Sequence, residues 1–489
     1  MYRLVALMVG VVLAFGLVPA GGAADTTTVS NRYLVVLEGT QTRDGFELAG
    51  TRDAAVALVT SAGGSVATDL SRQIGVLVAE SSSPAFAETL RASGLVAEVG
   101  EDFAVKALPS AAEAVAVSPS GGGPEQTEDP LEPLQWDMQQ IRAPEAHDAQ
   151  AGWRAVDVGI LDTGIDGRHA DFHDPLGGGT NVDCSRGRNS IAFLPTGPGV
   201  GNPDPCTDNQ FHGTHVAGTV AAQANGAGIV GVAPNVTLVP VKVCDSSGFC
   251  YASAAVDAIT YAGDQKFDVI NMSFFVDDNE FQQSTEFKCM DDPVQKSFRQ
   301  AVERAVQYAR SQGVTPVAAL GNSDEDLAHP SEPNENNCDV VPAETQGVVG
   351  TAALGPRSEK ASYSNYGTGA ADVAAPGGNG TTGDCRRTVL STIPGEAYGC
   401  FQGTSMASPH AAGVAALIVS QFGELGSDGD VKLPPTTVEN YLQSTTVDIG
   451  LPGYDECFGN GRIDALRAVV HDTSSVYDAT APFCPEYEE

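Results

Sequence analysis

The chain has 489 residues, and its 62 acidic side chains outnumber 26 basic ones, which gives a formal net charge of −36. Because this charge would repel phosphates and the sequence has no basic cluster, nucleic-acid binding is excluded as its function. The length exceeds that of one average domain and is sufficient for a large hydrophobic core.

The N-terminus has the pattern of an export signal. Arg3 precedes an apolar run from Leu4 to Val18, and small residues follow up to Ala24. This pattern predicts a secretory signal peptide, residues 1–24, and hence a secreted, extracellular protein. An uncleaved anchor is the alternative, but the run is short for a membrane span and no later run is long and apolar enough. We therefore expect no membrane association after signal cleavage.

The cysteines also favour export. All ten lie between Cys184 and Cys484, and none forms a CxxC pair that would indicate a zinc site. Disulfides in an oxidising compartment are therefore the better interpretation. The sequence does not determine their connectivity. The simplest expectation joins neighbours: Cys184 with Cys206, Cys244 with Cys250, Cys289 with Cys338, Cys385 with Cys400, and Cys457 with Cys484.

Residues 29–107 lack cysteine and predict a small α+β domain. Strands are expected in NRYLVVLEG, IGVLVAE and VAEVGEDFAVKA, and helical spacing runs from Thr51 to Ala62 and from Pro84 to Ser93. The next stretch is rich in Ser, Pro, Gly and Glu. Residues 108–130 are therefore expected to form a flexible linker.

From residue 131 to 472 the pattern changes to buried strands alternating with helices. Strands are expected in VDVGILDTG, VTLVPVKV, FDVINMS, VTPVAAL, GVVGTA and ADVAAPG. Helices are expected at His212–Gln223, Ala252–Gly263, Val294–Gln312, Ser405–Gln421 and Gly461–Val470. This alternation predicts an α/β fold with a mainly parallel central sheet and helices on both faces, in which functional residues gather at the carboxyl ends of strands. Residues 473–489 form an acidic tail.

Three polar residues suggest chemistry only when they are taken together. Asp162 ends a buried strand, His212 opens a helix, and Ser405 opens another helix, where a serine N-cap would be ordinary. A serine nucleophile needs a base, and the base needs a carboxylate to orient it. The order Asp, His, Ser is one of the known triad orders. A lipase or esterase is disfavoured by this order and because Ala407 breaks the G-x-S-x-G elbow.

Four sequence blocks then carry a resemblance. ILDTGIDGRHADF, HGTHVAGTVAA, GIVGVAPN and GTSMASPHAAGVAAL resemble the signature blocks of the subtilisin-like serine proteases, over about Trp136 to Val470. Residues 29–107 are similar, more weakly, to the inhibitory propeptide of that family. The resemblance implies a secreted endopeptidase that is made as a zymogen and cleaves itself within residues 107–133.

The resemblance also implies roles for single residues. Ser405 would form the acyl-enzyme, His212 would act as general base, and Asp162 would hold His212. Asn322, in ALGNSD, would donate to the oxyanion together with the Ser405 backbone N–H. Thr404 would support that site.

A calcium site is implied as well. Its ligands would be oxygens of Asp171, Asn225, Gln223, Ala227 and Ile229, with Glu132 or Gln135 as one more. The alternative is an ordinary glycine-rich loop. No organic cofactor is expected.

The substrate cleft departs from the family pattern. The wall that usually reads Ser-Leu-Gly-Gly is SFFVDD here, from Ser273 to Asp278. Ser273 and Gly321 are expected to contact an extended peptide, and Phe274 and Phe275 would reshape the side-chain pocket. No cleavage preference follows.

Two further alternatives concern the whole protein. A subtilisin fold used only for binding would normally lack a triad residue, and all three are present here. A kexin-like enzyme would need an extra β-domain, for which the 84 residues after Ser405 are too few. We expect a monomer whose partners are peptide or protein substrates and its own propeptide.

Overall fold

The computed structural model describes residues 26–108, 116–117, 129–174, 179–194, 202–275, 292–328, 339–427 and 429–484. The expected signal peptide, most of the expected linker, and the expected pair Cys289 with Cys338 lie outside these residues.

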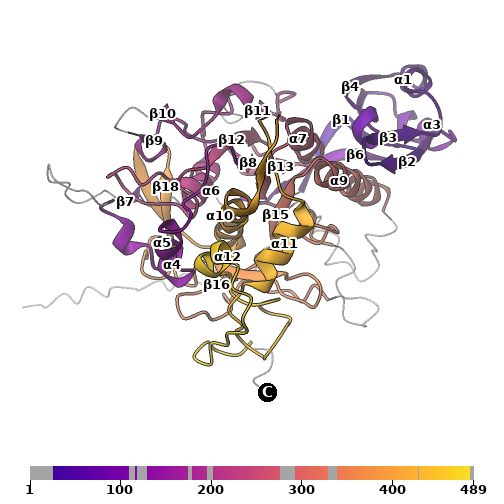
Figure 1. Cartoon of the computed structure of the whole chain (residues 1–489). Coiled ribbons are helices and arrows are strands. Elements are labelled where there is room, and N and C mark those ends of the chain that lie inside the picture. Colours follow the sequence, from indigo (N-terminus) through magenta and orange to yellow (C-terminus); the bar gives the residue numbers. More distant parts are fainter. Residues whose placement is uncertain are drawn as a thin grey trace, which may run out of the picture.

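A seven-stranded parallel sheet forms the centre of the molecule (Figure 1). Its strand order is β11-β12-β8-β14-β15-β16-β17. The strands are β8 (Asp157–Asp162), β11 (Arg188–Asn189), β12 (Thr237–Lys242), β14 (Val269–Met272), β15 (Thr315–Ala319), β16 (Val349–Leu354) and β17 (Val373–Pro376). Almost every residue of these strands is buried, as expected for a sheet that is covered on both faces.

Helices cover both faces of this sheet. One face packs on α7 (Ala252–Gln265) and α9 (Pro293–Ser311), which also pack on each other. The other packs on α6 (His212–Ala221) and α10 (Thr404–Phe422). The helices α4 (Trp136–Gln140), α5 (Ala143–His147), α11 (Pro435–Ser444) and α12 (Ala465–Val470) lie around α10. The expected fold class is confirmed.

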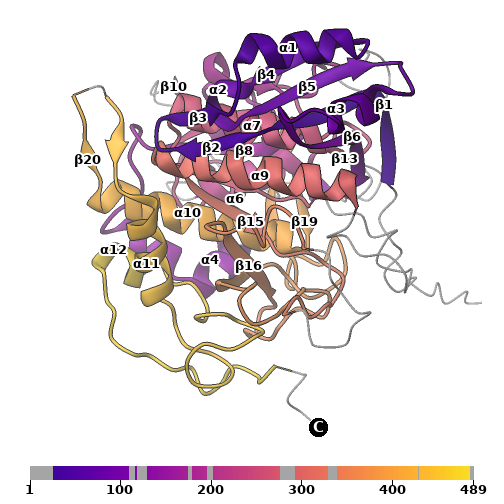
Figure 2. The same cartoon turned by 90° about the vertical axis from the view of Figure 1, so that its right-hand side faces the viewer.

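The N-terminal part is a second, antiparallel sheet with the order β13-β6-β1-β5-β4. Its strands are β1 (Thr26–Leu37), β4 (Gly64–Leu70), β5 (Val76–Ser81), β6 (Val96–Lys106) and β13 (Phe249–Tyr251), and its helices are α1 (Arg52–Ser61), α2 (Ser71–Ile74) and α3 (Phe86–Arg91). Figure 2 shows this sheet lying over α7 and α9.

Strand periodicity explains how this sheet is held. Alternate residues such as Val35 and Leu77 face a small core with α3, whereas Val36 and Val78 face the large core shared with α7 and α9. The ring of Phe103 packs edge-on against Phe298 of α9, with centroids 5.4 Å apart. The N-terminal sheet therefore buries one apolar face on the rest of the protein.

The remaining elements are short. A hairpin of β18 (Val389–Ile393) and β19 (Ala397–Phe401) is joined by β7 (Ala116–Val117). The other short strands and 3-10 helices are β2 (Gly39–Thr42), β3 (Gly45–Leu48), β9 (His173–Asp174), β10 (Gly179–Thr180), β20 (Glu424–Leu425), β21 (Val431–Lys432), Glu132–Leu134, Ala170–Phe172 and Cys184–Arg186. Strand β4, the β18–β19 hairpin and α11 were not anticipated.

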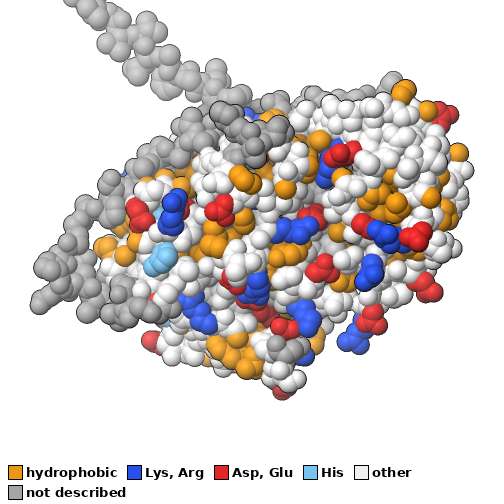
Figure 3. All heavy atoms as spheres, turned by 90° about the horizontal axis from the view of Figure 1, so that it is seen from above, with side chains coloured by type: hydrophobic (Ala, Val, Ile, Leu, Met, Phe, Trp, Pro, Cys, Tyr) orange, Lys and Arg blue, Asp and Glu red, His pale blue; other side chains and the backbone are white. Residues whose placement is uncertain are grey.

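Four expected disulfides are confirmed: Cys184–Cys206, Cys244–Cys250, Cys385–Cys400 and Cys457–Cys484. The last of these ties the described part of the C-terminal tail to the body of the protein. On the face seen in Figure 3, acidic and basic side chains are interspersed, so the negative charge is not gathered there in one patch. Among the described residues, no helix combines the length and apolar character that crossing a bilayer requires.

Candidate active site

The candidate active site lies where three neighbouring strands end. Asp162 is the last residue of β8, Ser273 follows β14 directly, and Asn322 follows β15 after two residues. Parallel strands bring their carboxyl ends to one edge, so these residues meet although they are far apart in sequence. Helices α6 and α10 begin at the same edge and supply His212 and Ser405.

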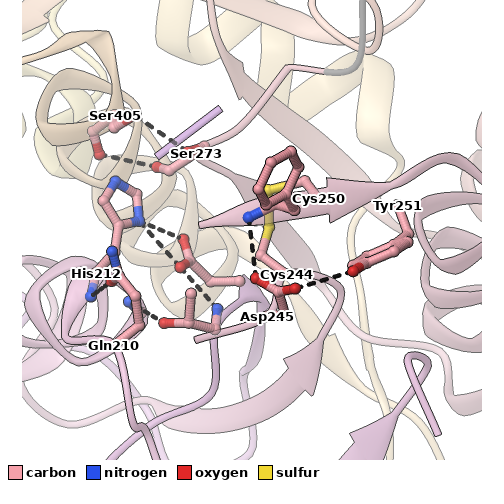
Figure 4. The surroundings of a disulfide bond; sticks show 12 residues. Gln210, His212, Cys244, Asp245, Cys250, Tyr251, Ser273 and Ser405 are labelled. Carbon is pink, nitrogen blue, oxygen red and sulfur yellow. Dashed lines mark hydrogen bonds and ion pairs between the residues drawn. A yellow bond between two sulfur atoms is a disulfide. The ribbon is translucent and has the colours of Figure 1, made fainter. Parts of the chain in front are cut away.

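Asp162 and His212 form a buried pair. The Nδ1 atom of His212 lies 2.9 Å from both carboxylate oxygens of Asp162, and the two residues are 1% and 0% exposed, respectively. The Thr163 backbone N–H also donates to Asp162 Oδ1, at 2.8 Å. The contact between His212 Nδ1 and the Asp162 carboxylate fixes the tautomer of His212 with the proton on Nδ1, which leaves Nε2 free to accept a proton. Figure 4 shows the imidazole of His212 directed towards Ser405.

A second carboxylate organises the start of α6. Asp208 accepts backbone N–H bonds from Gln210, Phe211 and Thr214, at 2.9–3.1 Å, and hydroxyl bonds from Thr163 and Thr214. Helix N-termini leave such donors unpaired, and a carboxylate there is favourable for the helix dipole. The chain needs this support because Phe211 has φ 145°, which is rarely adopted by residues with a side chain.

Ser405 does not cap its helix, which corrects the sequence-based interpretation. The N-cap is Gly403, with φ 156°, and the helix begins at Thr404. The N-cap is glycine because few other residues adopt this backbone conformation. Ser405 is therefore the second helical residue, and its backbone N–H is one of the donors that a helix start leaves free.

The Ser405 hydroxyl is held close to Ser273. It donates to the Ser273 carbonyl oxygen at 3.1 Å, and the Ser273 hydroxyl donates back to the Ser405 carbonyl oxygen at 2.8 Å. That carbonyl is available because Pro409, four residues along the helix, has no N–H to bind it. Rotation of the Ser405 side chain would turn its hydroxyl from Ser273 towards His212.

A buried polar chain continues below this pair. The Asn271 amide donates to the Ser273 hydroxyl at 2.8 Å, and Ser408 donates to Asn271 Oδ1 at 2.7 Å. All three side chains are fully buried. Because each polar group has a partner, the chain fixes the end of β14 against α10 and thereby the position of Ser405.

Asn322 is oriented by Thr404. Its Oδ1 accepts from the Thr404 backbone N–H at 2.8 Å and from the Thr404 hydroxyl at 3.0 Å, while that hydroxyl accepts from the Gly321 N–H at 3.1 Å. With Oδ1 bound in this way, Nδ2 remains as the donor of the Asn322 side chain, and the residue is exposed. A methyl group placed on Gly403 would lie 3.6 Å from the Ser405 nitrogen, and 3.7 and 3.8 Å from Oδ1 and Nδ2 of Asn322. The Ser405 N–H and the Asn322 amide therefore lie on the same side of Gly403, and two such donors close together are what an oxyanion site requires.

The neighbouring histidines have other contacts. The Nε2 atom of His215 lies between the carbonyls of Val389 and Gly399, and burial lowers the pKa of His215 to about 3. His410 binds Asp137 through Nε2 and Met406 O through Nδ1, so both of its nitrogens are engaged. His215 Nδ1 is buried without a hydrogen-bond partner in the part of the chain that the structure describes, whereas the imidazole of His212 is turned towards Ser405 (Figure 4).

The four residues expected to contact substrate differ in their burial and in their hydrogen bonds. Ser273 presents its carbonyl beside Ser405, but the Gly321 N–H is already bound by Thr404. Phe274 is 1% exposed and belongs to the hydrophobic core, so its side chain does not line an open pocket. Phe275 is only half-buried beside the same core.

Strand β13 forms a further wall of the candidate cleft. The Cys244–Cys250 disulfide (Figure 4) joins its middle residue to the segment after β12. The Cys244 N–H donates to the Asp162 carbonyl oxygen at 3.3 Å. Asp245 lies inside this loop and accepts from the Tyr251 hydroxyl at 2.9 Å. The disulfide therefore links the backbone of Asp162 to an edge strand that an extended chain can pair with.

Four of the expected calcium ligands, Gln223, Asn225, Ala227 and Ile229, lie in the loop after α6, and Asp171 contacts this loop from the 3-10 helix Ala170–Phe172. Ile229 N–H and the Tyr398 hydroxyl donate to the two oxygens of Asp171, and burial raises the pKa of Asp171 to about 7. Among the described residues, the carbonyl oxygens of Gln223, Ala227 and Ile229 accept no hydrogen bond, and no group of three or more His, Cys, Asp and Glu could hold a metal. A cation would thus depend on these carbonyls, and their free oxygens suit hard calcium.

Sequence reasoning missed Asp208, Asn271 and Ser408. An aspartate four residues before the helix that starts at His212 is a capping signal, so Asp208 was detectable. Asn271 and Ser408 carry no local signal, because each acts only through a partner that is distant in sequence.

The family is shown by comparison with known proteins. A model described as the subtilase family, peptidase S8, matches residues 154–461. Subtilisin DY of Bacillus licheniformis is 35% identical over 313 residues, covering 64% of this chain and 90% of that protein. Subtilisin E of Bacillus subtilis is 32% identical over 336 residues, covering 68% of this chain and 70% of that protein.

Solved structures agree on the fold. The epidermin leader peptide processing serine protease of Staphylococcus aureus has a TM-score of 0.67 at 21% identity and covers 90% of this chain and 98% of its own. A lanthipeptide protease has a TM-score of 0.56 at 24% identity, covering 70% and 96%. The matched family and the curated subtilisins make this protein a serine-type endopeptidase that acts on peptide or protein substrates. The chain belongs to the subtilase family of serine proteases.

Proposed function

We propose that this protease hydrolyses peptide bonds through an acyl-enzyme on Ser405, with His212 as general base and Asp162 as its orienting carboxylate. The observation that carries this proposal is the contact of His212 Nδ1 with both oxygens of Asp162, at 2.9 Å, beside a serine at a helix start. His212 Nε2 takes the Ser405 proton as Oγ attacks the scissile carbonyl carbon. The imidazolium, stabilised by Asp162, then protonates the leaving amine.

The oxyanion would be bound by the Ser405 N–H and Asn322 Nδ2. Their position on the same side of Gly403, and the fixed amide of Asn322, support this assignment. Such preorganised donors stabilise the charge that develops in the transition state. His212 then takes a proton from a water molecule, whose oxygen attacks the acyl carbon. As the bond between that carbon and Ser405 Oγ breaks, His212 returns the proton to Oγ and the carboxylic acid product is released.

The N-terminal sheet would act as an inhibitory propeptide before its removal. Support comes from β6, which pairs antiparallel with β13, and from Leu108, whose N–H binds the Gly248 carbonyl oxygen at 3.2 Å. A chain in this position competes with an extended substrate. Asp102 of β6 also accepts the N–H and hydroxyl of Ser253, at 2.9 and 2.5 Å, at the start of α7. This contact satisfies helix donors and would hold the propeptide in place.

We further infer that the enzyme is exported, monomeric and holds calcium. The N-terminal signal pattern and the disulfides support export into an oxidising compartment. Asp171, the carbonyls of Gln223, Ala227 and Ile229, and Asn225 Oδ1, which accepts from the Ala227 N–H at 2.9 Å, would hold the ion, and its charge would stabilise the loop.

The nucleophile is tested with Ser405→Ala, and Ser420→Ala near the far end of the same helix is the control. We expect Ser405→Ala to remain at precursor size and to leave casein uncleaved, while Ser420→Ala matures. A Ser405→Ala protein that still matures in isolation and cleaves casein would refute the proposal.

A further inference from the structure

A carboxylate from the start of the catalytic part lies in the glycine-rich loop after α6. Asp129 is 5% exposed, and its Oδ1 accepts backbone N–H bonds from Asn225, Gly226 and Ala227, at 3.1, 2.9 and 3.0 Å. Burial raises the pKa of Asp129, and the three donors counter that rise. Three consecutive N–H groups directed at one oxygen make an anion-binding concavity of backbone.

The residues after Asp129 continue this contact along the same loop. The Leu131 N–H donates to the Gly228 carbonyl oxygen at 2.7 Å. Gln135 is fully buried and makes two bonds to the Val230 backbone, each of 3.0 Å, one as donor and one as acceptor. Residues 129–135 thus lie against residues 225–230, to which Asp129, Leu131 and Gln135 are bonded. We call residues 129–135 the clasp.

The loop under the clasp connects to the active site on two sides. It follows α6, which begins with His212, and its Ile229 N–H donates to Asp171. Asp171 in turn accepts from Tyr398 of β19, the strand that leads to Gly403 and Ser405. A free loop of this kind, with three glycines from residue 226 to residue 231, would have high conformational entropy, which the clasp removes.

We propose that Asp129 is an anchor which the mature enzyme retains, and that the loop Asn225–Ala227 is its carboxylate-binding site. The inference rests on the proposed zymogen processing. It narrows the cleavage to a bond before Asp129, because removing Asp129 would take a charged acceptor from three backbone N–H groups of this partly exposed loop. Of these groups, only the Ala227 N–H has a second acceptor within the described residues, Asn225 Oδ1. The anchor acts through N–H donors and so is independent of whether Asp171 and the loop carbonyls hold calcium.

N-terminal sequencing of the mature wild-type enzyme tests retention without any variant. The expected mature chain begins at or before Asp129. A mature chain that begins at Pro130 or later overturns the proposal. Because the active wild-type enzyme is sequenced, this result is separate from the Ser405→Ala test.

Thermal unfolding of single variants, made in the wild-type protein, tests whether Asp129 acts as an anchor. We expect Asp129→Ala to lower Tm by about 4 °C, because it removes three charge-assisted bonds, and Asp129→Asn to lower Tm less, because Asn keeps an acceptor oxygen. Glu145→Gln is the matched control: Glu145 is an exposed acid outside the clasp and outside the expected cation ligands, and its variant should keep the wild-type Tm.

Each variant is measured in excess EGTA and in excess CaCl2. The difference in Tm between Asp129→Ala and wild type should be equal in both, since the partners of Asp129 are N–H groups. A difference that vanishes in EGTA would show that the Asp129 carboxylate acts through a cation and would overturn the proposal. A Glu145→Gln loss as large as that of Asp129→Ala would show a general charge effect and would overturn it as well. If Asp129→Ala does not fold, the sequencing result and Asp129→Asn still decide.

Discussion

The two ends of helix α6 use the same physical device over very different sequence distances. At the start, Asp208 binds the N–H groups of the turn that leads into His212, only four residues away. After the end, Asp129 binds three N–H groups of a loop 96–98 residues away. In both places a buried carboxylate satisfies backbone donors. The comparison teaches that the first contact positions a catalytic group, whereas the second holds a loop outside the cleft.

The largest effect is expected from Asp162→Asn. The amide keeps the shape of Asp162 but favours the wrong tautomer of His212 and cannot stabilise the imidazolium. We expect kcat on a peptide substrate to fall by about 10⁴-fold. Steady-state kinetics measures this, with Asp129→Asn as a control that should retain kcat. An equal loss of kcat in Asp162→Asn and Asp129→Asn would contradict the claim that Asp129 acts outside the active site.

The next largest effect is expected from Asn322→Ala, which removes a donor from the oxyanion space and leaves the triad intact. We expect kcat to fall by about 10²–10³-fold with KM nearly unchanged, because the donor acts mainly in the transition state. A loss confined to KM would instead assign Asn322 to substrate binding.

Asp208→Asn tests whether the carboxylate at the start of α6 positions His212, in contrast to Asp129 after the end of the helix. Asp208 Oδ2 accepts from both the N–H and the hydroxyl of Thr214, so an amide nitrogen there would face a donor. We expect a loss of about 2 kcal/mol in unfolding free energy together with a lower kcat, since the start of α6 carries His212. Asp129→Asn should lower stability without changing kcat. Chemical denaturation and kinetics on both variants separate these outcomes, and an unchanged kcat in Asp208→Asn would contradict the positioning role.

The smallest effect is expected on removing the disulfide of the cleft wall. The double change Cys244→Ala and Cys250→Ala frees β13 from the segment bound to Asp162. We expect KM for a long peptide substrate to rise by about 3–10-fold, roughly 0.7–1.4 kcal/mol, while a single-residue ester is hydrolysed as before. The matched control replaces Cys457 and Cys484, and a similar rise in KM there would refute a local role for β13.

The sequence predicted most of the central strands, and singled out Asp162, His212 and Ser405 as candidate residues, for physical reasons. A parallel sheet covered on both faces produces continuous apolar runs, and strand ends such as Asp162 stand out because a charged residue closes such a run. The helix at Ser405 was also predicted, but its N-cap was misplaced: serine is the commoner cap, and the unusual φ of Gly403 has no side-chain signal.

Other features depend on contacts that sequence spacing does not encode. Strand β4 and the β18–β19 hairpin have weak patterns and are fixed by pairing with strands around them. Phe274 was expected to shape the pocket, yet its burial is decided by elements packed from distant segments. The same holds for Asp129, whose partners lie far along the chain.

Fluorophosphonate labelling followed by peptide mapping tests the central claim most directly, because only an activated serine reacts with this probe. The predicted result is one adduct on Ser405 in the mature enzyme, lost in His212→Ala and retained in Asp129→Asn. An adduct on a different serine, or labelling of Ser405 that is undiminished in His212→Ala, would contradict it.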